Sequence, residues 1–333
     1  MGTTWIEEMP KAEMHIHLEG AFRWETIREL HPDDLPESPP WLTADTVFPD
    51  FDDFRHVFLN IIRPATGTPE QIERHTFEVL EDLARQNVRY AEVITGPGFH
   101  TDQGLSFGEV LEPIKRGKER AEAAYPIQSR FMLGLNRHMD RDYVSQQFYE
   151  VIEFAGPEGS GLLSGIDLQG DERTSPPDDF VEIFDEARRR GLRLRAHAGE
   201  LLGAKSVKRT IDLLGVEHIS HGVGAIEDPA LIQRIATEGI YLHVCPTSNV
   251  RLGLVNSLKE HPLKVLLESG CRTTINSDDP LLFGATIADE YRNSVENLGL
   301  TQEQLMQTVR YAFEGALLDK EEHQAILQEL NRL

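Results

Sequence analysis

The chain has few cysteines, fewer basic than acidic residues, and no long apolar run. Its two cysteines, Cys245 and Cys271, cannot form a disulfide framework, so we expect a reducing, cytoplasmic location. With 33 Lys and Arg residues against 56 Asp and Glu residues, the formal net charge is −23. This excess of negative charge disfavours nucleic acid and anionic membrane surfaces as partners.

No apolar stretch reaches the roughly 20 residues that a membrane-spanning helix needs. Residues 1–10 contain no basic segment followed by an apolar run, so no signal peptide is expected. No internal repeat or low-complexity segment is present. The 333 residues have ordinary apolar and charged fractions, and they suffice for one α/β barrel or for two ordinary domains.

Short apolar segments alternate along the chain with longer segments of helical periodicity. Strands are expected at residues 11–17, 88–94, 129–137, 161–168, 192–196, 217–220, 240–244 and 272–275. Helices are expected at 69–86, 107–124, 177–191, 206–214, 229–237 and 262–269, and again after residue 286. This alternation, without a break in composition, predicts a single domain over residues 1–333. Its expected fold is a parallel (β/α)8 barrel with additional N-terminal and C-terminal helices.

Two histidines end the first expected strand. Because alternate side chains of a strand share one face, His15 and His17 present both imidazoles to the same point. An isolated His-X-His motif is more often a pair of solvated or core histidines than a metal site. Here, however, His197, His221 and Asp278 also stand at the carboxyl ends of expected strands, the rim where barrel enzymes carry their catalytic residues.

The side chains at this rim predict a metal site made of His15, His17, His197 and Asp278. Three imidazoles and a carboxylate, without a thiolate, suit zinc, with iron, cobalt or manganese as substitutes. We expect one zinc ion per chain. Such an ion lowers the pKa of a bound water from about 15.7 towards about 7 and so supplies hydroxide near neutral pH.

Two further rim residues predict acid–base chemistry. His221 is expected to hydrogen-bond the attacking water, orient it and accept its proton. Glu200 follows His197 by three residues, and in a partly desolvated pocket its raised pKa would let it deliver a proton to the substrate. Taken alone, Glu200 could be a surface acid and His221 a satisfied core histidine. Together with Asp278 they form the expected catalytic set.

Five motifs resemble the motif series of the adenosine and adenine deaminase family. They are His15–Gly20 (HIHLEG), Asp167–Glu172 (DLQGDE), His197–Glu200 (HAGE), Ser220–Gly222 (SHG) and Asn276–Pro280 (NSDDP). They occur in family order and, together, reach from about residue 10 to residue 280. The resemblance implies a zinc-dependent barrel that hydrolyses the 6-amino group of a purine and releases ammonia.

The resemblance also implies how the purine is held. Glu200 would protonate the purine N1, Asp279 would contact N7, and the backbone N–H of Gly170 would meet N3. His17 and Glu19 would border the substrate. The expected partner is thus a small-molecule purine, and the sequence does not indicate an oligomeric state.

Glu19 bears on the choice of substrate. Adenosine-specific relatives usually carry an Asp here, which binds the ribose 5′-hydroxyl, whereas Glu is more familiar in adenine-type members and in deaminases of 5′-modified nucleosides such as aminodeoxyfutalosine. Residues 170–172 and 245–249 look like the adenosine type instead. On balance these features favour adenosine or a related nucleoside over free adenine.

Other functions are disfavoured to different degrees. Cytidine-type zinc deaminases carry H-x-E followed by P-C-x-x-C, but here Cys245 precedes Pro246 and no second cysteine is nearby. An amide or lactone hydrolase of the same barrel superfamily would not need Glu200 or the paired Asp278 and Asp279. A catalytically silent relative would be expected to lack one of the rim residues, and all are present.

An apolar stripe at helical spacing, Phe51, Phe54 and Phe58, follows the first strand. Such a stripe is usually core packing. Because of its place in the chain, it is also a candidate lid over the mouth of the site.

Overall fold

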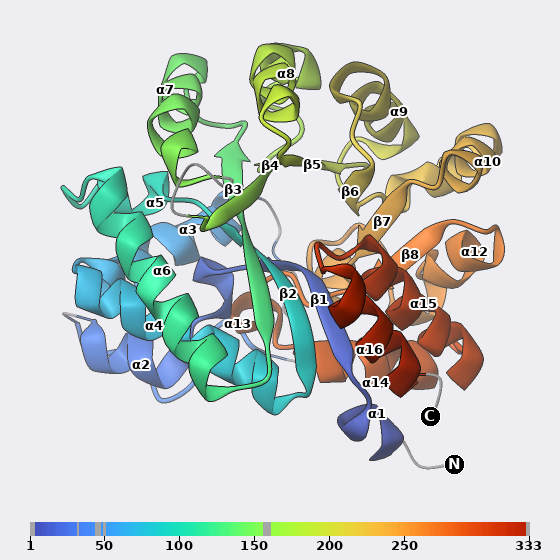
Figure 1. Cartoon of the computed structure of the whole chain (residues 1–333), viewed down its shortest axis with the longest axis horizontal. Coiled ribbons are helices and arrows are strands. Elements are labelled where there is room, and N and C mark those ends of the chain that lie inside the picture. Colours follow the sequence, from blue (N-terminus) through green and yellow to red (C-terminus); the bar gives the residue numbers. More distant parts are fainter. Residues whose placement is uncertain (1–3, 32, 44–47, 49–50, 156–160, 331–333) are drawn as a thin grey trace.

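The computed structural model describes residues 4–31, 33–43, 48, 51–155 and 161–330 (Figure 1). Eight strands form one sheet in chain order, and neighbouring strands are parallel. They are β1 (Lys11–His17), β2 (Val88–Thr95), β3 (Gln128–Asn136), β4 (Leu163–Gln169), β5 (Arg193–Ala198), β6 (His218–His221), β7 (Tyr241–Val244) and β8 (Arg272–Ile275). The predicted (β/α)8 barrel is confirmed, and each strand lies within two residues of its expected bounds.

The barrel is closed just beyond the end of β8. Asp278 pairs with Ile16 of β1 in a parallel bridge. The backbone N–H of His17 donates to the carbonyl oxygen of Asp278 at 2.9 Å, and the N–H of Asp278 donates to the carbonyl oxygen of His15 at 3.0 Å. The first and last strands are therefore joined at the same residues that were predicted to bind a metal.

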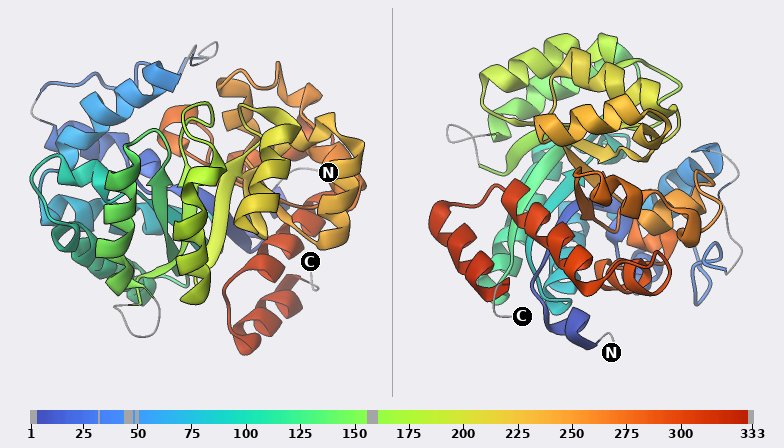
Figure 2. Two further views of the ribbon diagram at one scale, coloured as in Figure 1. Left: turned by 90° about the horizontal axis from the view of Figure 1, so that it is seen from above. Right: turned by 90° about the vertical axis from the view of Figure 1, so that its right-hand side faces the viewer.

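Helices lie outside the strands, as both views of Figure 2 show. Those that follow β2 to β7 are α5 (Gly98–Thr101), α6 (Phe107–Ala124), α7 (Arg141–Val151), α8 (Val181–Arg189), α9 (Gly203–Leu214), α10 (Pro229–Glu238), α11 (Pro246–Arg251) and α12 (Leu263–Glu268). Before β2 lie α1 (Thr4–Glu8), α2 (Trp24–Leu30), α3 (Phe51–Val57) and α4 (Pro69–Arg85). The chain continues after β8 with α13 (Pro280–Phe283), α14 (Ile287–Glu296), α15 (Gln302–Gly315) and α16 (Lys320–Leu330).

Helix α7 was not predicted, although its sequence carries the usual signals. Asp140 accepts hydrogen bonds from the N–H groups of Asp142 and Tyr143 and so caps the first turn. Val144, Phe148 and Val151 are buried at helical spacing. Within the described part of the chain, no helix is both long and apolar enough to cross a membrane.

The aromatic segment after α2 is helical, as its spacing indicates. Helix α3 passes directly into a π-helical turn, Phe58–Ile62, and then into a 3-10 turn, Arg63–Thr66. Phe54 and Phe58 are in contact, with ring centroids 5.0 Å apart. The side chain of Phe51 lies outside the described structure. Whether this segment acts as a lid therefore stays a prediction.

Candidate active site

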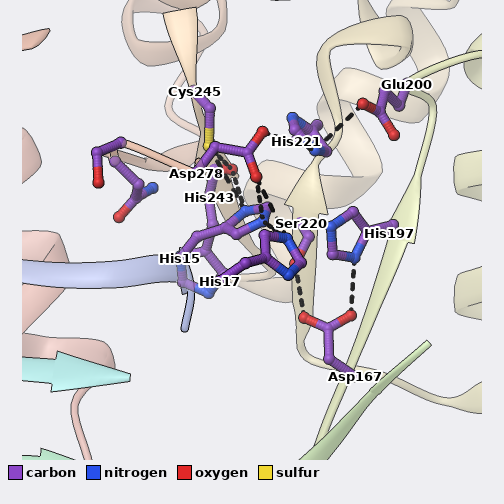
Figure 3. A network of polar contacts seen from close by, with 12 residues as sticks. His15, His17, Asp167, His197, Glu200, Ser220, His221, His243, Cys245 and Asp278 are labelled. Atoms are coloured by element: carbon purple, nitrogen blue, oxygen red, sulfur yellow. Dashed lines mark hydrogen bonds and ion pairs between the residues drawn. The ribbon is translucent and has the colours of Figure 1, made fainter. Parts of the chain in front are cut away.

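The four side chains predicted to bind a metal lie together at the carboxyl-terminal end of the barrel (Figure 3). The Nε2 atoms of His15 and His17 are 3.3 Å apart. Oδ1 of Asp278 lies 3.4 Å from Nε2 of His15 and 3.2 Å from Nε2 of His17. The ring of His197, from β5, has its centroid 4.8 Å from that of His15. Strands on opposite sides of the barrel thus bring these donors to one point.

In two of these rings, the Nδ1 atom lies beside a hydrogen-bond acceptor. Nδ1 of His197 lies 2.9 Å from Oδ1 of Asp167, and Nδ1 of His15 lies 3.4 Å from the carbonyl oxygen of His243. Although burial favours the neutral acid, His197 and Arg195 hold the pKa of Asp167 below its ordinary value. An ionised Asp167 accepts the Nδ1–H of His197, which leaves the Nε2 lone pair for the site.

Asp278 and Asp279 are adjacent, buried carboxyl groups whose pKa values move in opposite directions. Burial alone would raise both. For Asp278 this effect is outweighed by the hydrogen bond to His17 and by the charge of His221, so its pKa lies below the ordinary value. The pKa of Asp279 is raised by burial and by the charge of Asp278. Asp278 is therefore the ionised partner and Asp279 the protonated one.

Backbone strain is concentrated at this rim. Among described residues other than glycine, only Asn87, His221 and Asp278 have positive φ, and the last two have values of 64° and 63°. Residues other than glycine rarely adopt this backbone conformation. It persists where surrounding contacts enforce it, often at functional sites. The barrel-closing hydrogen bonds supply such contacts for Asp278.

Glu200 and His221 are neighbouring side chains in the wall of the site. Oε1 of Glu200 lies 3.5 Å from Nε2 of His221. Burial raises the pKa of Glu200 to about 8, so the carboxyl group is protonated at neutral pH. Its backbone is held by Glu172, which accepts hydrogen bonds from the N–H groups of Glu200 and Leu202 at 3.1 and 3.0 Å. Glu200 is thus a buried acid on an anchored loop, as an acid catalyst requires.

A cavity of about 330 Å³ opens beside these groups. This volume is at the lower end of the range for small-molecule sites. The predicted rim residues that line it are His17, Glu19, Gly170, His197, Glu200, His221, Asp278 and Asp279. Phe54 and Phe58 also line it, so the aromatic segment borders the cavity.

Comparison with known proteins agrees with this geometry. The family model described as "Adenosine deaminase" matches residues 10–333. The chain belongs to the adenosine deaminase family. It is 35% identical to an adenine deaminase of Mesorhizobium japonicum over 322 residues, which cover 96% of this chain and 98% of the relative. It is 33% identical to an adenosine deaminase of Vibrio vulnificus over 303 residues, covering 89% and 90% of the two chains.

Solved structures extend the likeness to the fold. An adenine deaminase from Arthrobacter aurescens superposes with a TM-score of 0.89 at 28% identity, covering 97% of this chain and 98% of that one. An amidohydrolase from Burkholderia ambifaria, solved with bound zinc, gives a TM-score of 0.88 at 25% identity, covering 99% and 93%. As a member of the adenosine deaminase family, this chain is a hydrolytic purine deaminase.

Glu19 borders the cavity, but one of its oxygens is already engaged by the protein. Oε1 accepts hydrogen bonds from Oγ1 of Thr95 at 3.0 Å and from the N–H of Gly96 at 3.2 Å, and it lies 3.3 Å from Nε2 of His100. These contacts outweigh burial and lower the pKa of Glu19. Glu19 is therefore an ionised group that ties the end of β1 to β2 and α5.

Two glycines among the motifs have steric reasons to be glycine. A Cβ atom at Gly20 would lie 1.6 Å from Oδ1 of Asp279, so any side chain there would displace this carboxyl group. Gly170 has a φ of 92°, and a Cβ there would lie 2.6 Å from Nδ1 of His138. The same Oδ1 of Asp279 is buried and has no hydrogen-bond partner among the described residues.

Sequence reasoning gave no role to several residues that support the site. Asp167 and Glu172 belong to the DLQGDE motif, yet their contacts with His197 and Glu200 link positions 30 and 28 residues apart. His100, which contacts Glu19, was not singled out at all. Its partner lies 81 residues away, and no local spacing reports such a pair.

Proposed function

We propose that this deaminase binds one zinc ion through His15, His17, His197 and Asp278, and that its preferred substrate is adenine. The observation that carries the proposal is the convergence of three imidazoles and an ionised carboxylate beside a protonated Glu200. Hydrolysis at a purine C6 needs both an activated water and a proton donor to the ring.

The donor set suits zinc. It offers nitrogen and carboxylate ligands without a thiolate. Asp167 also orients the ring of His197 by accepting a hydrogen bond from Nδ1, as carboxylate partners of metal-bound histidines do. When bound, zinc would lower the pKa of a water beside Asp278 towards neutrality. Every other step falls to side chains of this chain.

Four groups of the chain have distinct tasks on the purine or on the attacking water. Glu200, protonated at neutral pH, delivers its proton to N1 as the attacking oxygen adds to C6. Asp279, whose pKa is also raised, has a free Oδ1 and donates a hydrogen bond to N7. Gly170 offers its backbone N–H to N3. Ionised Asp278 accepts one proton from the water and passes it to the 6-amino group, which leaves as ammonia when the C6–N bond breaks. The proton remaining on the new hydroxyl returns to Glu200, and the 6-oxo product forms.

The contacts of Glu19 favour the free base over a nucleoside, contrary to the balance of the sequence motifs. In adenosine-specific relatives the residue at this position binds the ribose. Here one carboxylate oxygen is committed to Thr95, Gly96 and His100. Relatives named adenine deaminase at 35% and 32% identity point the same way. Adenosine is the second candidate because a relative of that name is 33% identical.

The test is ammonia release from adenine, adenosine and a 5′-modified adenine nucleoside, with kcat/KM for each. We expect adenine to lead by about tenfold or more, since a mismatch of a single methylene in a pocket is already typically worth about 10–200-fold. A higher kcat/KM for either nucleoside would overturn the substrate assignment. No ammonia from any 6-aminopurine would overturn the activity.

The metal is tested separately. Chelator treatment should abolish activity, and zinc should restore it. The variants His15→Ala and Asp278→Ala should hold less metal than the wild type. His31→Ala, whose side chain does not line the cavity, should hold the same amount. Wild-type metal content in both ligand variants would refute the ligand assignment.

A further inference from the structure

The two ring nitrogens of His221 have different surroundings. Nε2 faces the active site, 3.5 Å from Oε1 of Glu200 and 3.9 Å from Oδ2 of Asp278. Nδ1 faces away from the site, 3.2 Å from Nδ2 of Asn249. A neutral imidazole carries its proton on one nitrogen only. The position of that proton decides whether His221 accepts a proton from water or donates a hydrogen bond to it.

A backbone group sets the direction of the hydrogen bonds behind His221. The N–H of Leu263, the first residue of α12, can only donate, and it lies 3.1 Å from Nδ1 of His261. Nδ1 of His261 is therefore an acceptor. Burial lowers the pKa of His261 to about 3, so the ring is neutral at working pH. Its proton must then be on Nε2.

Asn249 continues this chain of hydrogen bonds, with donation in the same direction. Nε2 of His261 lies 3.1 Å from Oδ1 of Asn249 and donates to it. The amide nitrogen of Asn249 then points to Nδ1 of His221, and an amide nitrogen can only donate. Nδ1 of His221 is an acceptor for this reason. All three side chains are buried, with exposed fractions of 5% or less, so water does not compete for these bonds.

We propose that Asn249 and His261 are positioning residues that hold neutral His221 in the tautomer with its proton on Nε2. His221 then donates a hydrogen bond into the active site. This differs from the expectation that His221 accepts the proton of the attacking water. In the new assignment His221 orients the water by donating to its oxygen, and the water's proton goes to Asp278.

The tautomer can be measured without substrate. In protein labelled with 15N-histidine, long-range 1H–15N correlation spectra distinguish a protonated from an unprotonated ring nitrogen, and His221→Gln identifies the signals of His221. Spectra are recorded for the protein as purified and after zinc is removed by chelation. We expect an unprotonated Nδ1 and a protonated Nε2 in both. A proton on Nδ1 in both samples would overturn the inference.

Asn249→Asp is the sharpest variant because it changes the side-chain shape little. A carboxylate has no N–H, so it accepts from both histidines and moves the proton of His221 to Nδ1. We expect the spectra to show this reversal. We also expect kcat to fall about 10²–10³-fold, as for the loss of one oriented donor, with KM within about threefold of the wild type. A merely structural role would change neither the tautomer nor kcat in this selective way.

His261 provides a matched pair of variants. His261→Gln keeps an N–H for Asn249 and an oxygen for the N–H of Leu263, so it should retain the wild-type tautomer and kcat. His261→Leu removes both and should yield a mixture of tautomers with lower kcat. Equal spectra and kcat for the two variants would contradict the role of His261.

The kinetic part of this inference rests on the proposed function, but the spectra do not. If the spectra agree and no 6-aminopurine is turned over, the proposed function fails and the tautomer assignment stands. If the tautomer of Asn249→Asp is reversed and kcat is unchanged, the donor role of His221 fails while the deaminase assignment stands. If Asn249→Asp does not fold, the wild-type spectra still decide the tautomer.

Discussion

Asp167 contacts His197 from the side of the ring opposite the proposed metal, with Oδ1 2.9 Å from Nδ1. Its other oxygen accepts from Oγ of Ser220 at 2.9 Å and from Nε of Arg195 at 2.6 Å. This carboxylate therefore both fixes the orientation of the ring and makes Nε2 a better ligand.

We expect Asp167→Asn to bind zinc about 10–100-fold more weakly, because an amide neither compensates the charge nor holds the ring as firmly. Competition with a chelator of known affinity measures the change. Ser220→Ala serves as the control. It removes only the hydroxyl that donates to Oδ2 of Asp167, so its zinc affinity should be near that of the wild type. Equal zinc affinity in the wild type and Asp167→Asn would rule out this supporting role.

Glu200→Gln should separate chemistry from binding. An amide cannot deliver a proton to the purine, so kcat should fall by about 10²–10⁴-fold while zinc content and substrate affinity are retained. Metal analysis and equilibrium binding accompany the rate measurement. Glu217→Gln, at an exposed acid, should leave kcat unchanged. Turnover by Glu200→Gln within about tenfold of the wild type would place the acid elsewhere.

Glu19→Asp should change the choice between base and nucleoside. The shorter side chain withdraws from Thr95, Gly96 and His100 and leaves more room beyond the purine. We expect kcat/KM for adenosine, relative to adenine, to rise about 10–200-fold, the usual effect of one methylene in such a pocket. Glu19→Gln keeps the length of the side chain and is the control. An unchanged ratio would make Glu19 a scaffold residue.

Gly20→Ala tests the position of Asp279. The added Cβ would lie 1.6 Å from Oδ1, so the carboxyl group must move away from its present place. A displacement of about 1 Å can cost about 10²-fold in rate, and we expect a loss of this order in kcat/KM with unchanged zinc content. Gly108→Ala, where the nearest atom is 3.9 Å away, should have little effect. Wild-type kcat/KM for Gly20→Ala would argue against a role for Asp279.

His75 makes stability depend on pH. Burial lowers its pKa from 6.5 to about 4, and Nε2 donates to the carbonyl oxygen of Ala65 at 3.1 Å. The unfolded chain binds a proton below pH 6.5, whereas the native ring does so only near pH 4. Its contribution to the free energy of unfolding is therefore present above pH 6.5 and is lost as the pH falls to 4.

The matching variant is His75→Gln, which keeps an N–H for Ala65 and cannot titrate. Between pH 6.5 and 4.5 the wild type should lose about 2 kcal/mol more unfolding free energy than this variant. Urea unfolding at the two pH values measures the difference. An equal loss in both proteins would show that His75 is not the group responsible.

The sequence predicted the barrel and the clustering of the proposed metal ligands because both depend on local patterns. His15 and His17 share one face of a strand, and their strand, like those of His197 and His221, ends at the same rim. In a parallel barrel, knowing where each strand ends is enough to place these side chains near one another.

Contacts that depend on side-chain direction were not predictable in this way. The direction of hydrogen bonding from Leu263 to His221 depends on three buried groups whose spacing along the chain follows no period. The engagement of Glu19 by His100 depends on where α5 leaves β2. For these residues, the residue type and the position along the chain do not identify the hydrogen-bond partner. Only the packed structure shows which atoms are in contact.

The hydrogen bonds that close the barrel belong to the proposed metal ligands. The peptide groups of His15, His17 and Asp278 join β1 to the chain after β8, and their side chains point to the proposed cation site. A cation held between these side chains therefore also holds together the two ends of the sheet. By linkage, binding that favours the closed arrangement stabilises it against local opening. With the proposed ion bound, the supply of metal in the cell would set how long the folded enzyme survives, as well as how fast it works.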